Sequence, residues 1–255
     1  MTRVVWDKTG EKIYETGVDR GMLYLREDPF SETARARAMS RKMTSRVSAP
    51  EGYSYGVPWN GLTAVNDNPS GAEANKHYAD NIPYLTLMSA EDLGATIEAF
   101  TYPRAFEVCE GKREMANGVI VGQQKREMFA FSYRTKVGND MDGDSFGYKL
   151  HLYYGCLASP TSRNYSTINE SPEPINFSWD VTTNPINMPG GFEPAASITF
   201  DTTTMTNAEL EKLAAIEDIL YGTADKEPRM VMPEELADLL SPDTAGRAAR
   251  AQVSR

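Results

Sequence analysis

Cysteine, histidine and long apolar runs are all scarce in this chain, and each shortage excludes a class of protein. The 255 residues include 2 Cys and 2 His, which are too few for a disulfide scaffold or a Cys-rich zinc site. No apolar run approaches the ~20 residues that a membrane-spanning helix needs. The first residues, MTRVVWDKTGEK, lack the apolar core of a secretory signal. We therefore expect no membrane association, and we expect Cys109 and Cys156 to be reduced thiols.

The sequence also lacks the short motifs that usually accompany catalysis. It has no GxGxxG, P-loop, GxSxG or HExxH pattern, and neither His77 nor His151 has a partner at metal-ligand spacing. The acid cluster GNDMDGDS at 138–145 is not an EF-hand, because Lys149 stands where the bidentate Glu is required. We interpret this cluster as a polar turn. We expect no enzyme activity, no cofactor and no metal site.

Basic residues are outnumbered, and they are unevenly placed. Lys and Arg total 26 against 36 Asp and Glu, which gives a net charge of −10 and a pI near 4.8. This balance argues against a protein that grips nucleic acid through its phosphates. The stretch 26–52 is net basic, with Ala, Arg and Met favouring helix from about 32 to 43. We interpret it as a long exposed insertion, either a solvated loop or an arm that docks on another molecule. Its candidate contact residues are Arg35, Met39, Arg41 and Met43.

Alternation of large and small or polar residues predicts a mainly β, antiparallel body. The pattern marks seven segments: 22–25, 84–88, 93–99, 127–137, 146–154, 175–181 and 196–200. We expect each strand to bury one face and to wet the other. A β-sandwich or a barrel-like curled sheet is then the economical arrangement. Trp179 is expected to point into its core.

Two helices are predicted near the carboxyl end. Thr206 and Glu209 form the capping pattern TxxE that opens a helix over about 206–221, and Gly222 ends it. We expect this helix to flank the sheet. Pro233 opens a shorter helix over 233–240. Residues 1–222 are thus predicted to form the principal domain, and residues 223–255 a C-terminal extension with a frayed tail after Leu240.

The segment GVPWNGLTAVNDNPSGAEANKHYADN at 56–81 combines turn-forming residues with almost no strand pattern. Long ordered loops of this kind usually bind something. We therefore predict that Trp59, Asn60 and Asn66 lie at a subunit interface. The alternative is a loop that covers one end of the sheets, with Trp59 as its plug.

Five stretches carry a resemblance to a known family. They are ETGVDRGMLYL at 15–25, the 56–81 segment, SAEDLGATIEAFTYPRAFEVCEG at 89–111, YRTKVGNDMDGDSFGYKLHLYYG at 133–155 and YSTINESPEPINFSWDVTTNP at 165–185. In this order the chain resembles the major tail proteins of long-tailed, non-contractile bacteriophages. The resemblance covers most of residues 1–222. The basic stretch 26–52 and the tail after Leu240 depart from the family pattern.

The resemblance implies a structural virion protein with no catalytic residue. It implies a tail tube subunit that forms hexameric rings, stacked into a hollow conduit for DNA ejection. It further implies assembly in the host cytoplasm, and a tape-measure protein, a tail terminator and a distal tail or baseplate protein as partners. Genomic DNA would pass through without specific binding, since an acidic wall repels phosphates. Three acids are candidates for the lumen or a ring-to-ring junction: Asp140, Asp142 and Asp144.

A carbohydrate-binding or carbohydrate-active β-sandwich is the alternative from another class. It is motivated by 13 Tyr, 3 Trp and abundant carboxylates. Neighbouring acids such as Glu107 with Glu110, or Glu91 with Asp92, resemble the paired carboxylates of glycosidases. A chain with 36 acids also forms such pairs by chance. Rings or tubes in electron microscopy would separate the two hypotheses.

Overall fold

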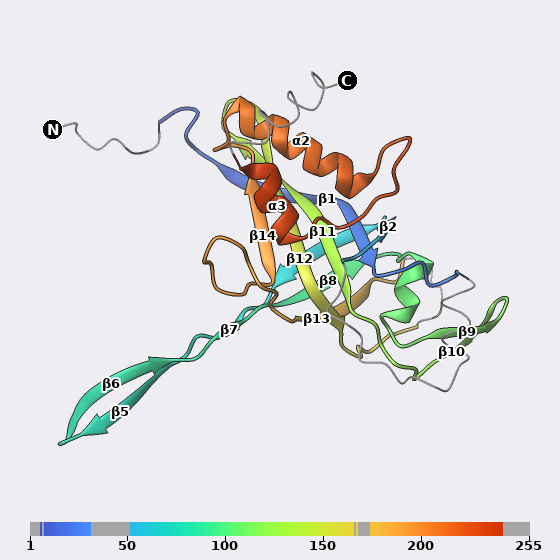
Figure 1. Cartoon of the computed structure of the whole chain (residues 1–255), viewed down its shortest axis with the longest axis horizontal. Coiled ribbons are helices and arrows are strands. Elements are labelled where there is room, and N and C mark those ends of the chain that lie inside the picture. Colours follow the sequence, from blue (N-terminus) through green and yellow to red (C-terminus); the bar gives the residue numbers. More distant parts are fainter. Residues whose placement is uncertain (1–5, 7, 32–51, 166, 168–173, 242–255) are drawn as a thin grey trace, which may run out of the picture.

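The computed structural model in Figure 1 describes residues 6, 8–31, 52–165, 167 and 174–241. It is mainly β, with 46% strand, 13% helix and antiparallel sheets, which confirms the predicted fold class. The strands are β1 (Tyr14–Leu25), β2 (Tyr55–Pro58), β3 (Leu62–Asp67), β4 (Ser70–Gly71), β5 (Ala74–Ala79), β6 (Ile82–Met88), β7 (Glu91–Asp92), β8 (Gly94–Ala99), β9 (Arg113–Ala116), β10 (Val119–Val121), β11 (Phe129–Asn139), β12 (Gly143–Ala158), β13 (Phe177–Thr183) and β14 (Ser197–Asp201). A 3-10 helix, η1, spans Arg104–Val108.

The main sheet folds over on itself. Its strand order is β2-β1-β11-β12-β13-β8-β3, and β14 pairs with β12 outside this path. Strands β2 and β3 stand at opposite ends of that order, yet only residues 59–61 separate them in the chain. Leu23 of β1, Ile97 of β8 and Trp179 of β13 belong to one buried cluster, so distant strands of the order pack face to face. Trp179 is fully buried there, as predicted.

The central strands are buried on both faces, which corrects the expectation that every strand wets one face. In β1, Leu23 lies in the buried cluster inside the curl, here called the inner cluster. Its neighbour Tyr24 lies in a second buried cluster outside the curl, here called the outer cluster. In β11, Phe131 likewise lies in the inner cluster and Ala130 in the outer cluster. The prediction holds for β8, where buried and partly exposed residues alternate. The second face of the central strands is shielded from solvent because helices cover it.

These helices match the predicted positions. Helix α2 (Asn207–Tyr221) begins with the expected capping box, in which the backbone N–H of Thr206 donates to Glu209 Oε2 at 2.8 Å. Helix α3 (Pro233–Leu240) follows. Buried side chains of both helices join the outer cluster, together with Met230 and Val231 from the connection between them. The described part of the C-terminal extension therefore packs on the same body.

Residues 56–81 do not form a loop, so that interpretation is wrong. They hold β2 to β5, and β3, β4 and β5 run outward as one side of a long hairpin that returns through β6, β7 and β8. His77 accordingly lies in a strand, not in a polar loop. The strand pattern is missing from the sequence because every residue of β5 is exposed. No core selects apolar residues for one of its faces.

Candidate functional site

A two-stranded hairpin of residues 74–88, here called the projecting hairpin, extends from the body into solvent (Figure 1). Strands β5 and β6 pair from Ala74 opposite Met88 to Ala79 opposite Ile82. Asp80 and Asn81 join them with φ values of 52° and 63°. Both residue types tolerate this left-handed conformation, which type I′ hairpin turns require. The tip is thus a tight, defined turn.

The root of the projecting hairpin is built into the main sheet. Val65 of β3 lies opposite Ile97 of β8, and the backbone N–H of Asn68 donates to the carbonyl of Gly94 at 2.8 Å. Further out along the chain, Gly71 and Ala72 have φ values of 86° and 52°. They lie where the pairing of β4 with β7 ends and before the pairing of β5 with β6 begins. The direction of the hairpin is therefore fixed by paired strands and by this left-handed step.

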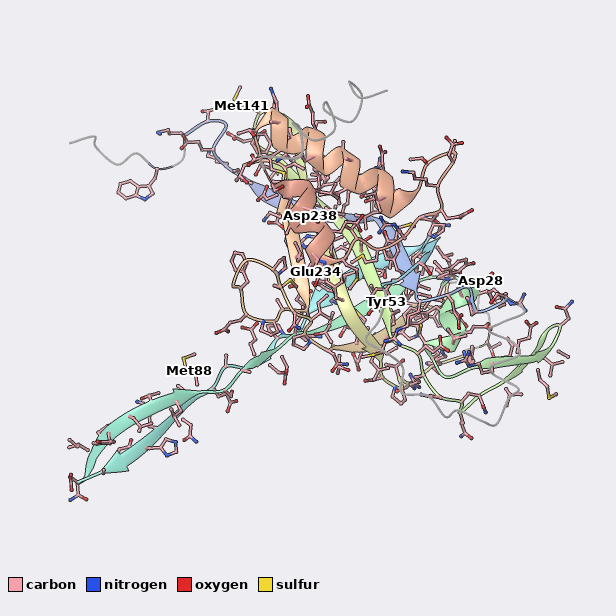
Figure 2. All side chains as sticks on the ribbon, viewed as in Figure 1. Asp28, Tyr53, Met88, Met141, Glu234 and Asp238 are labelled. Carbon is pink, nitrogen blue, oxygen red and sulfur yellow. The ribbon has the colours of Figure 1, made fainter. Side chains whose placement is uncertain are left out.

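The side chains of the projecting hairpin are unusually apolar for a surface. Six large apolar residues are 40–70% exposed: Tyr78, Ile82, Tyr84, Leu85, Leu87 and Met88, the last labelled in Figure 2. An isolated two-stranded hairpin is marginally stable in water, and contiguous exposed apolar surface usually marks an interaction site. We therefore take the projecting hairpin as the candidate functional site.

A second, smaller hairpin lies at the opposite end of the longest axis in Figure 1. It consists of β9 and β10, residues 113–121, and is here called the short hairpin. Ion pairs link it to the body, from Arg113 to Glu127 and from Glu114 to Arg104. Beside it lies a cavity of about 480 Å³, here called the short-hairpin groove. Its apolar lining includes Pro29, Phe30, Val108, Met115, Ala116 and Val121.

Trp59 is a core residue of the protomer, so its predicted place at a subunit interface is wrong. Its side chain is 2% exposed. The ring lies 4.5 Å from the ring of Phe106 and 5.4 Å from that of Trp179, and Nε1 donates to the carbonyl of Thr101 at 3.0 Å. The alternative, a plug, describes it better. A partner protein cannot reach this indole in the folded protomer.

The other predicted interface residues have mixed outcomes. Asn60 is exposed and lines a second cavity of about 450 Å³, beside Arg20 and Tyr221. Asn66 is exposed at the root of the projecting hairpin, opposite Thr96. Their role at an interface stays a prediction. Residues 32–51 lie outside the described residues, and with them the predicted helix of the basic insertion and four candidates: Arg35, Met39, Arg41 and Met43.

The predicted acidic turn joins β11 and β12. Two of its carboxylates contact the amino-terminal segment: the backbone N–H of Gly10 donates to Asp140 at 2.8 Å, and the hydroxyl of Tyr14 donates to Asp144 at 3.0 Å. Asp142 accepts from the side-chain amide of Asn139 at 3.0 Å. These contacts give the acids a structural role within the protomer. Their place in a lumen or ring junction stays a prediction.

Of the predicted carboxylate pairs, Glu110 binds cations of the protomer, and Glu91 and Asp92 diverge. Glu110 is only 7% exposed on its side chain, and it accepts from Lys112, Arg163 and the indole N–H of Trp179. Both oxygens of this carboxylate are therefore engaged by donors within the protomer. Glu91 and Asp92 are successive residues of strand β7, so their side chains point to opposite faces.

His151 and the two cysteines occupy structural positions. His151 stacks on Tyr133 at 4.6 Å between ring centroids, and burial lowers the pKa of its imidazole. Cys109 and Cys156 are buried free thiols, as predicted, and burial raises the pKa of both. Within the described ranges, no group of three or more His, Cys, Asp or Glu side chains could hold a metal ion. None of the helices in those ranges is long and apolar enough to cross a membrane.

Comparison with protein-family models and with curated proteins finds no match to this chain.

Proposed function

We propose that this protein is the structural subunit of a bacteriophage tail tube, which assembles into stacked hexameric rings. The observation that carries the proposal is the projecting hairpin, an exposed apolar element held at a fixed angle by the main sheet. The resemblance of five sequence stretches to major tail proteins supplies the identity of the assembly. The mainly β fold is compatible with both.

Assembly explains a hairpin that the protomer does not need for its own core. The inner and outer clusters contain no residue from 74–88. Apolar side chains kept in water would favour aggregation unless a specific partner covers them. A contact between two different surfaces of identical subunits generates a ring when its rotation closes, and a stack or filament when it does not. A tail tube is an assembly of this kind.

The acidic balance of the chain supports a conduit for DNA. A duplex carries one phosphate per ~1.7 Å of its axis, so a net negative wall repels it and allows it to slide. We propose that genomic DNA passes without specific binding, and that length control and capping fall to a tape-measure protein and a tail terminator. A distal tail or baseplate protein would close the other end. The subunit would assemble in the host cytoplasm, reside in the virion and carry no enzyme activity.

Negative-stain electron microscopy of the purified protein tests the proposal. We expect rings or hollow tubes from the natural sequence. The double variant Tyr78→Ser, Tyr84→Ser should melt like the natural protein, because both side chains are exposed, and yet form fewer or no tubes. Phe192→Ser is the matched control, since this aromatic is 78% exposed in a connection of the body. A stable monomer that binds glycans would refute the proposal in favour of the carbohydrate-binding alternative.

A further inference from the structure

The projecting hairpin and the short strands beneath it, β4 and β7, form a ribbon of two strands that leaves the body (Figure 1). Among the described residues, no hydrogen bond or ion pair connects residues 70–92 with the body. Such a ribbon is thinnest perpendicular to its sheet, so it bends most easily toward one face or the other. The direction of the hairpin therefore depends on how the body holds the two faces of its root, residues 65–68 and 93–97.

The inner face of the root carries an acid where the strand pattern calls for an apolar residue. Val65 and Asp67 lie two residues apart in β3, so their side chains point to the same face, and Val65 packs against the inner cluster. Asp67 therefore faces the inside of the curl. There Tyr153 of β12, which is 2% exposed, donates its hydroxyl to Asp67 Oδ1. A buried phenol of the body thus holds the inner face of the root.

This contact ends a chain of donors that begins in the core. The hydroxyls of Tyr133 and Tyr153 lie 3.1 Å apart. A phenol has one hydrogen, and that of Tyr153 is directed at Asp67, so Tyr133 is the donor to Tyr153. Burial raises the pKa of both phenols, which keeps them protonated at neutral pH. Hydrogen bonds to a carboxylate are stronger than those between neutral groups. The chain therefore ends on its strongest acceptor, Asp67.

A second chain of hydrogen bonds holds the outer face of the root. The side-chain amide of Asn68 donates to Thr96 Oγ1 at 2.8 Å, and the hydroxyl of Thr96 donates to Asp180 Oδ1 at 3.0 Å. Thr96 of β8 and Asp180 of β13 lie opposite each other in the main sheet. Their neighbours in sequence, Ile97 and Trp179, belong to the inner cluster, so both side chains point away from it. The root is thus tied to the body on both faces.

We propose that Asp67 and Asn68 are positioning residues, which set the direction of the projecting hairpin by tying its root from opposite faces. Both ties are made by side chains, and the backbone pairing of β3 with β8 does not require them. The inference rests on the proposed function, because a hairpin of fixed direction meets the same surface on every neighbouring copy. Loss of one tie leaves the strands paired but lets the hairpin swing toward one face. An arm that swings must be ordered at each contact, which weakens association.

Double electron–electron resonance between two spin labels tests the ties in the unassembled full-length protein. One label is attached through Lys76→Cys and the other through Ala215→Cys, at exposed positions of β5 and α2. The natural cysteines are buried, and the raised pKa of their thiols keeps them unreactive. Asp67→Ala and Asn68→Ala each remove one tie. Asn66→Ala is the matched control, because this exposed side chain of β3 forms no hydrogen bond with the described residues.

We expect a narrow distribution of label distances when both ties are present, and the same distribution for Asn66→Ala. Asp67→Ala and Asn68→Ala should each make it about twofold wider, because a hydrogen bond that limited the swing toward one face is gone. Asp67→Asn should keep the distribution narrow, since its amide oxygen still accepts from Tyr153. An unchanged width in both tie-removing variants, or equal broadening in the control, would overturn the inference and leave the proposed function standing.

Tube assembly is the second readout. Asp67→Ala should raise the protein concentration needed for tubes by about tenfold, as expected for the loss of one hydrogen bond to a charged group. Asp67→Asn should stay near the natural value, and the melting temperature of the body should be unchanged in both variants. Tubes at the natural concentration from a variant with broadened distances would overturn the role of the ties in assembly. Absence of rings and tubes from the natural sequence would refute the proposed function, and the label distances would still decide what sets the direction of the hairpin.

Discussion

Replacing Trp59 with Ala should destabilise the protomer itself rather than act first on assembly. The indole is 2% exposed and packs in the inner cluster, with ring centroids 4.5 Å from Phe106 and 5.5 Å from Phe131. Truncation of a buried Trp to Ala costs about 3–5 kcal/mol, since apolar burial is lost and a cavity remains. The carbonyl of Thr101 also loses its donor, at 3.0 Å. We expect a loss of about 4 kcal/mol in the free energy of unfolding.

A loss of this size is large against the total stability of about 5–15 kcal/mol that is typical of native proteins. For a chain of this length, each kcal/mol lowers the melting temperature by about 2–4 °C, so a fall of roughly 8–16 °C is expected. Urea unfolding followed by tryptophan fluorescence, at concentrations below those that support assembly, measures the free energy directly. Far-UV circular dichroism gives the melting temperature independently.

Asn60→Ala is the matched control, because it alters the next residue in the chain, whose side chain is exposed. Its effect on unfolding should stay within about 0.5 kcal/mol. If Trp59→Ala left the unfolding transition unchanged and abolished only ring or tube formation, the assignment of this residue to the core would be refuted. The interface hypothesis drawn from the sequence would then be right.

Three further predictions concern the hairpin root, an ion pair and the acidic turn. Gly71→Ala would put a Cβ 2.4 Å from a backbone carbonyl oxygen across the hairpin, at a φ of 86°. Tube assembly should fall while the melting temperature of the body stays unchanged. Loss of both assembly and melting temperature would argue against a hairpin that is separate from the body. Arg229 lowers the pKa of Glu235, so this pair stabilises the protein above the ordinary carboxyl pKa, and the contribution is lost as the pH falls through the folded-state pKa. Because both side chains are over a third exposed, Glu235→Gln should cost at most about 1 kcal/mol at neutral pH. The urea midpoints of variant and natural protein should converge as the pH falls through the folded-state pKa of Glu235, and a constant difference would contradict the ion pair. The third prediction is charge reversal to Lys at all three acids of the turn, Asp140, Asp142 and Asp144. The resulting tubes should retain DNA in a salt-dependent manner, measured by co-sedimentation. Tubes that bind no DNA would place the turn outside the lumen.

The sequence predicts those parts of the fold whose residues face one core. Strand β8 alternates because the inner cluster lies on one side of it. Helix α2 is predicted to within one residue, since its capping box is a local signal that needs no tertiary information. The length of β1 is underestimated because its first half leaves the core and is exposed. Strand β12 also continues past its predicted end through residues 155–158, where neighbouring residues are buried together and do not alternate. Alternation reports burial, and it ends where burial ends.

The projecting hairpin is predicted only in part: its second strand is expected at 84–88 and is found as β6, whereas β5 is missed for the same physical reason. All residues of β5 and β6 are exposed, so neither face is under selection for a core. One local signal was nevertheless available: Asp80 and Asn81 are residue types that favour a type I′ turn, and Tyr84 to Met88 follow them with strand-forming side chains. Trp59 was misplaced because composition alone cannot distinguish a buried indole from an exposed one when the surrounding strands are missed.

The placement of unpaired strand edges explains why folding and assembly should be separable in this molecule. At one end of the main sheet, β2 is covered by the chain itself: the backbone N–H of Gly56 donates to the carbonyl of Pro228 at 2.9 Å, and that of Met230 donates to the carbonyl of Tyr53 at 3.0 Å. At the other end, β3 continues outward into the long hairpin. Among the described strands, the two-stranded sheets at the extremities pair with no third strand, and their exposed apolar residues lie outside both buried clusters. Substitutions in the projecting hairpin or the short hairpin should consequently change assembly with little effect on the protomer, and substitutions at buried aromatics should do the reverse.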